Sequence, residues 1–163
     1  LPILEDVEFS HRLRRRGQRL VMNPAILARH VFNYTAARSL RNAFRKSMYW
    51  TVYSIANRDL LADSGTASLG LKLNVVSYAL CTALLGLFLV TGTPAWLGAV
   101  ALLAAANLCA NRGLLRAFRQ TSGGGFALGA ALYYLLVYPL AVGAGAAAGA
   151  LRYPRLIGPR GAR

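Results

Sequence analysis

Residues 73–111 read LNVVSYALCTALLGLFLVTGTPAWLGAVALLAAANLCAN and contain no charged side chain. A helix needs about 20 apolar residues to cross the hydrocarbon core of a bilayer, so this run is long enough for two crossings. Residues 91–94 (TGTP) are typical of a tight turn and divide the run. We therefore expect one membrane-spanning helix over residues 73–91 and a second over residues 95–110.

A second uncharged run, residues 120–151, predicts a third span over residues 126–151. Pro139 lies inside it, so the chain either crosses as a full span, which we favour, or turns back at that proline. A buried helical core is the alternative for all three segments. A chain of 163 residues offers too little amphipathic surface to cover three wholly apolar helices, which favours a mainly α membrane protein. The pairs Gly125/Gly129 and Gly145/Gly149 would allow close helix approach.

The charged residues lie outside these runs. The chain has 19 Lys and Arg against 5 Asp and Glu, a formal net charge of +14. The rule that basic loops stay inside places the first seventy residues and residues 112–119 in the cytoplasm, with the turn at residues 91–95 outside. We expect a multi-pass protein of the cell (inner) membrane, although a full third span would put the basic tail, residues 152–163, outside against that rule.

Residues 36–70 predict a basic amphipathic helical linker. Ser39 is the expected N-cap, and apolar residues then recur at steps of three to four. The apolar residues are Leu40, Phe44, Met48, Val52 and Ile55. The opposite face carries Arg38, Arg41, Arg45 and Lys46. Such a helix suits the membrane interface, with Tyr49, Trp50 and Tyr53 at headgroup depth, and packing on a soluble domain is the alternative.

Carboxylates are rare and gather near the start. They are Glu5, Asp6, Glu8, Asp59 and Asp63. The first three open a basic helix that we expect over residues 5–16, ending at Gly17, with His11 exposed on its surface. Acidic residues at a helix start are stabilised by the free N–H groups and the dipole, so helix capping explains them. A carboxylate in a cleft that acts as a general base is the functional alternative.

Two short strand candidates follow this helix. Residues 19–22 and residues 25–31 are rich in apolar residues, and the pair Asn23-Pro24 predicts a turn between them. His30 lies near the end of the second candidate.

The order of these residues resembles the closing part of a family 2 glycosyltransferase domain. The matching positions are Glu5-Asp6-Val7-Glu8-Phe9, Arg12-Leu13-Arg14-Arg15-Arg16-Gly17, Arg19-Leu20, Pro24 and Arg29-His30. The basic helix and the later spans are similar to membrane-bound members. The resemblance implies that residues 1–35 are the end of an α/β GT-A catalytic domain, followed by the linker of residues 36–70 and the spans within residues 71–151.

The resemblance also implies a role for each matched position. Asp6 would be the catalytic base that takes a proton from an acceptor hydroxyl as it attacks a nucleotide sugar, with inversion. Glu5 would shape the catalytic site or bind the acceptor, and Glu8 and Trp50 would contact substrate. His30 would ligate a divalent metal, Mg or Mn, on the donor diphosphate. The acceptor would be lipid-linked or a polysaccharide.

Some features of the family do not occur in this sequence. The family's nucleotide-binding half, with its Asp-x-Asp motif, would precede Leu1, so we expect this chain by itself to be inactive. Processive members carry Gln-x-x-Arg-Trp, whereas residues 46–50 (KSMYW) keep only Trp50. This favours transfer of single sugars over polymer synthesis.

A non-enzymatic membrane anchor or interaction protein is the alternative function. Its basic faces would bind anionic lipid, at about 1 kcal/mol for each Lys or Arg near the surface. Nucleic acid is not an expected partner, because the spans divide the basic residues and no reader motif occurs. Transport is not favoured either, because no ionisable residue lies within a predicted span.

Overall fold

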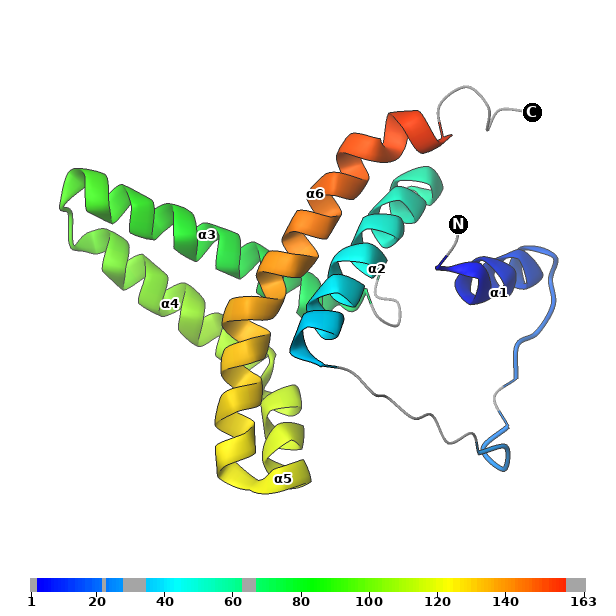
Figure 1. Cartoon of the computed structure of the whole chain (residues 1–163), viewed down its shortest axis with the longest axis horizontal. Helices are drawn as coiled ribbons and strands as arrows, with labels where there is room; N and C mark the ends of the chain where they lie inside the picture. The colour runs from blue at the N-terminus through cyan, green and yellow to red at the C-terminus, as the bar shows by residue number, and fades with distance from the viewer. Residues whose placement is uncertain (1–2, 22, 28–34, 63–66, 158–163) are drawn as a thin grey trace.

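The computed structural model describes residues 3–21, 23–27, 35–62 and 67–157, and most of them are helical (Figure 1). In chain order the elements are α1 (Glu5–Arg15), α2 (Ala36–Asn57), α3 (Leu69–Thr91), α4 (Ala95–Ala110), α5 (Arg112–Leu132), the π-helical segment η1 (Tyr133–Val137) and α6 (Tyr138–Ile157). No strand occurs within the described ranges. The expectation of a mainly α chain is confirmed.

The two strand candidates are wrong where the structure describes them. Residues 19–21 lie outside any regular element, and Asn23 begins a turn in which its carbonyl accepts from Ile26 N at 3.2 Å. A strand needs a neighbouring strand to receive its backbone hydrogen bonds, and the described part of the chain offers none. The remaining positions of both candidates, residue 22 and residues 28–31, lie outside the described residues.

Helix α1 ends where the sequence predicts. Gly17 has a φ of +74°, and the backbone N–H of Gln18 donates to the carbonyl of Leu13 at 3.0 Å. A glycine adopts this left-handed conformation without the cost that a side chain would add, so it closes the last turn of the helix.

Helix α2 begins one turn earlier than predicted. The Oγ1 of Thr35 accepts from the backbone N–H of Arg38 at 3.2 Å, so Thr35 is the N-cap instead of Ser39. Ser39 lies inside the helix, where its Oγ accepts from the hydroxyl of Tyr133 at 2.8 Å. The serine therefore joins α2 to η1 and does not cap its own helix.

Helices α2 and α6 run side by side in the same direction (Figure 1). Gly145 and Gly149 are buried at their contact, and a Cβ atom on either would overlap the backbone carbonyl of Phe44 or Met48. The close approach expected of this glycine pair is confirmed within the chain itself. A Cβ at Gly125 or Gly129 would meet nothing within 4 Å.

Within the described residues, two helices are long and apolar enough to cross a membrane. They cover Leu69–Thr91 and Arg112–Arg155, while α4 is shorter. Only 6% and 11% of their most apolar windows are buried, whereas the core helix of a soluble protein would be mostly buried. The predicted turn is confirmed, because α3 ends at Gly92 with a φ of +66° and α4 begins three residues later.

The second of these segments is not a single straight helix. Ser122 and Gly123 have non-helical dihedral angles, and the chain reverses there (Figure 1). The ring of Phe118, before the reversal, lies 6.4 Å from that of Phe126 and 6.5 Å from that of Tyr134. The chain then stays helical through Pro139 and does not turn back at that residue.

The π-helical segment explains how a proline is accommodated within an apolar helix. The N–H of Tyr138 donates to the carbonyl of Tyr133, the spacing of a π-helix. The next donor in this register would be Pro139, which has no N–H, so the carbonyl of Tyr134 lacks its partner. The fully buried side chain of Asn74 supplies that partner from α3, with Nδ2 at 2.8 Å from the carbonyl oxygen.

Asn74 is the first member of a buried amide cluster. Its Oδ1 accepts from Nδ2 of Asn107 at 2.8 Å, and Oδ1 of Asn107 accepts from Nδ2 of Asn111 at 2.8 Å. The hydroxyl of Tyr134 donates to Oδ1 of Asn111 at 3.2 Å. These bonds join the α3–α4 hairpin to the start of the long helix.

We expect Asn74→Leu to destabilise the protein because it leaves the Tyr134 carbonyl and the Asn107 amide without partners. Each orphaned group costs about 1–3 kcal/mol. The cost should be smaller in a Pro139→Ala background, because an alanine at this position restores the backbone donor. Thermal unfolding of the two single variants and the double variant in detergent measures this coupling. Equal costs of Asn74→Leu in both backgrounds would contradict the assignment of Asn74 as the substitute donor.

Candidate functional site

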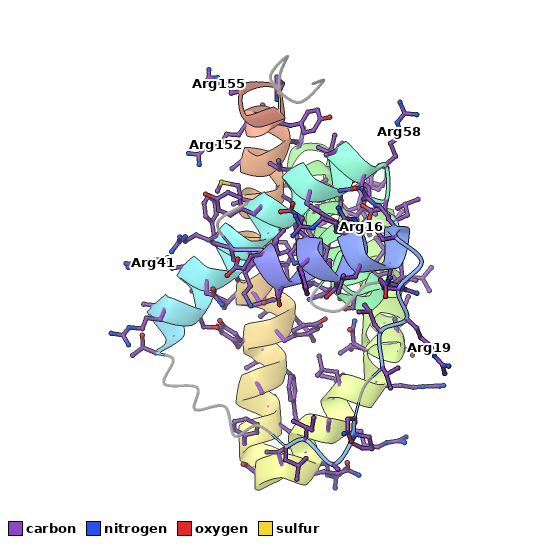
Figure 2. The ribbon with its side chains drawn as sticks, turned by 90° about the vertical axis from the view of Figure 1, so that its right-hand side faces the viewer. Arg16, Arg19, Arg41, Arg58, Arg152 and Arg155 are labelled. Carbon is purple, nitrogen blue, oxygen red and sulfur yellow. The ribbon has the colours of Figure 1, made fainter. Side chains whose placement is uncertain are left out.

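Helix α1 lies against the C-terminal half of α2 (Figure 2). Leu4, directly before α1, is 3% exposed and packs with Trp50 and Tyr53 of α2, which are 8% and 6% exposed. The rings of Trp50 and Tyr53 meet edge to face with centroids 6.0 Å apart, an arrangement that aromatic pairs favour. This small apolar cluster holds α1 on α2.

The two aromatic rings expected at headgroup depth contact protein. Trp50 and Tyr53 are buried beneath α1, and their depth in a membrane stays a prediction. The apolar part of an aromatic ring is stabilised by any contact that removes it from water, and Leu4 provides such a contact here. Tyr49, half-buried, packs at the edge of the same cluster.

Polar contacts fix the orientation of α1 on α2. Nδ1 of His11 lies 2.7 Å from the hydroxyl of Tyr53, and the Arg15 guanidinium donates to Oδ1 of Asn57. His11 is half-buried, so its expected exposure on the helix surface is wrong. Burial raises the pKa of Tyr53, with Arg15 opposing it, so the phenol stays protonated at neutral pH.

A pocket of about 430 Å³ opens where α1 meets α2. Its lining includes Asp6, Ser10 and Arg14 from α1 and Lys46 and Trp50 from α2. The structure thus brings together the predicted base and one of the two residues expected to contact substrate, although they are far apart in the sequence. The pocket joins a carboxylate, two cations and an aromatic side chain.

The other predicted site residues lie elsewhere. Glu8 lines a neighbouring pocket of about 410 Å³, together with Tyr53 and Asn57. Glu5 lines neither pocket. His30 lies outside the described residues, so its expected role as a metal ligand stays a prediction.

The carboxylate of Asp6 lies in the first turn of α1. The N-cap is Leu4, and α1 has no side-chain cap bond. Oδ1 of Asp6 accepts from the N–H of Val7 at 2.9 Å. The Asp6 carboxylate thus accepts from one of the free N–H groups of the first turn, which agrees with the capping interpretation of the acidic cluster, although the N-cap residue Leu4 makes no side-chain bond.

The part of the chain that the structure describes does not form a metal site. No three side chains of His, Cys, Asp or Glu come together within it. Mg²⁺ and Mn²⁺ prefer several oxygen ligands, so Asp6 alone does not fit such an ion. The described residues therefore do not fit the divalent metal that the resemblance implies.

Sequence reasoning missed the contributions of Arg14 and Ser10. Asp6, Ser10 and Arg14 recur at a four-residue step, so they share one face of a helix. That spacing is visible in the sequence. The packing of α2 against this face, which makes it one wall of a pocket, is not. The sequence pattern assigns Lys46 only to a solvated basic face.

No family model, no curated protein and no solved structure matches this chain.

Proposed function

We propose that this chain is the C-terminal portion of a membrane glycosyltransferase in which Asp6 is the general base. The observation that supports this most directly is that Asp6 and Trp50 line one pocket at the junction of α1 and α2. The resemblance of residues 5–30 to family 2 glycosyltransferases supplies the reaction. The lining of the pocket agrees with it, because a carboxylate and an aromatic side chain in one pocket suit a sugar or a hydroxyl-bearing acceptor.

In the proposed reaction Asp6 accepts the proton of an acceptor hydroxyl. The oxygen attacks the anomeric carbon of a nucleotide sugar as the bond from that carbon to the nucleotide diphosphate breaks. Attack from the face opposite the leaving group inverts the configuration at the anomeric carbon.

We further propose that the protein is a multi-pass protein of the inner membrane with α1 on the cytoplasmic side. The long apolar helices support membrane insertion, and the basic residues support a cytoplasmic α1–α2 unit near anionic lipid. Figure 2 shows Arg41, Arg152 and Arg155 projecting from the same edge of the molecule. Cations gathered at one edge would hold it against a negatively charged surface.

The proposal is tested by blocking the pocket. Membranes that contain the full-length gene product should transfer radiolabel from a nucleotide sugar to lipid or polysaccharide. Ser10→Phe should lower the initial rate roughly a hundredfold, because a misplaced acceptor loses its attack geometry. Ser10→Ala, which leaves the space open, is the matched control and should keep the rate. Equal rates for both variants, or no transfer from any nucleotide sugar, would favour the non-enzymatic anchor instead.

A further inference from the structure

Two cations in the Asp6 pocket have no assigned role in the proposed reaction. Arg14 is exposed on α1, and Lys46 is half-buried on α2. Within the described ranges, neither side chain makes a hydrogen bond or an ion pair with another residue. Two unpaired cations that converge on one pocket from different helices form a receptor for an anion.

We propose that Arg14 and Lys46 bind a phosphate group of the ligand that occupies the Asp6 pocket. Arginine presents a planar fork of donors to phosphate oxygens, and lysine adds a compact charge, so the pair suits a phosphate. The lining carries one carboxylate against these two cations. The inference rests on the proposed function, because it assigns the phosphate to the acceptor whose hydroxyl Asp6 deprotonates.

The position of the pocket favours a phosphate carried by a lipid. Ser47, the residue after Lys46, donates through Oγ to the carbonyl of Val142 on α6 at 2.7 Å. Lys46 therefore lies one residue from the contact with a segment that is long and apolar enough to cross a membrane. If this segment crosses a bilayer, the lipids around it bring their phosphates close to α2 and to Lys46.

Trp50 provides the measurement, because it lines the pocket and the chain has only one other tryptophan, Trp96. In a Trp96→Phe background its fluorescence should respond to a phosphate in the pocket. The protein is placed in phosphatidylcholine nanodiscs and titrated with inorganic phosphate, and is separately placed in nanodiscs that also contain phosphatidic acid. A response only with phosphatidic acid supports a lipid phosphate, and a response to inorganic phosphate supports a soluble one.

Lys46→Met and Arg14→Gln should each weaken the response about tenfold or more, since each removes charge-assisted hydrogen bonds. Arg45→Gln and Arg16→Gln are the matched controls, because they remove the same charge from α2 and from the end of α1 outside the pocket. The proposal is overturned by no response to either phosphate, or by equal responses in pocket and control variants. The two proposals can fail separately. Sugar transfer that persists in Asp6→Asn would contradict the role of Asp6 as the base, and it would leave the phosphate-binding results unchanged.

Discussion

Asp6→Asn in the full-length gene product is expected to lower the rate of sugar transfer by about 10²- to 10⁴-fold, the usual contribution of a general base. Asparagine has nearly the same size, and its carbonyl oxygen still accepts from the N–H of Val7 as the carboxylate does. It does not accept a proton from the acceptor hydroxyl. Donor binding should therefore stay nearly intact while turnover falls. Initial rates and calorimetric titration with the nucleotide sugar measure the two quantities.

Asp59→Asn is the charge-matched control for this experiment. Asp59 follows α2 and lines neither pocket, so its neutralisation should leave transfer within about twofold of the parent, the size expected away from the chemistry. Unchanged turnover in Asp6→Asn would contradict the assignment of Asp6 as the general base. Unchanged turnover with a lowered melting temperature would show that Asp6 acts through the N-terminus of α1 alone.

Gly149→Leu is expected to separate α2 from α6 and to lower the apparent melting temperature in detergent by roughly 5–10 °C. A Cβ at this position would overlap the carbonyl of Met48 and lie 2.9 Å from Cβ of Thr51. Backbone does not move aside as a flexible side chain does, and overpacking of this kind costs about 1–3 kcal/mol. For a chain of this length 1 kcal/mol corresponds to about 2–4 °C. Far-UV circular dichroism during heating measures the change.

Gly129→Leu provides the matched control on the same long helix. A Cβ at Gly129 would meet nothing within 4 Å, so the larger side chain has room and replaces a residue that weakens helices. Its melting temperature should equal or exceed that of the parent. A similar loss of stability in both variants would show that replacing a glycine is itself destabilising and that the contact with α2 plays no part.

Much of the apolar half of the molecule could be predicted from the sequence. The predicted bounds of the second span, residues 95–110, match α4, and the turn before it lies where the glycine and proline place it. Charge and hydropathy decide these elements locally, so a sequence is enough to find them. Helix α3 begins at Leu69, four residues before the predicted start, because Ser68 caps it and Lys72 is accommodated in its first turn.

The contacts between distant residues could not be predicted in this way. A glycine pair at a four-residue step occurs twice in the chain, and only the pair at residues 145 and 149 receives another helix. Asn74 has no local signal for its bond to η1, since its role depends on Pro139 far along the chain. The strand candidates are wrong where the structure describes them, at residues 19–21 and 25–27, because a local apolar pattern does not supply the neighbouring strand that a strand needs.

In the proposed membrane enzyme, the contact between α2 and α6 would set the height of the Asp6 pocket relative to the lipid tails. Helix α1 packs on α2, and α2 is held along α6 at Gly145 and Gly149. Sliding α2 by a single helical turn would displace the pocket by about 5.4 Å along α6. That displacement exceeds the length of a hydrogen bond, so in the proposed enzyme these two glycines would fix the height of Asp6 relative to an acceptor held in the bilayer.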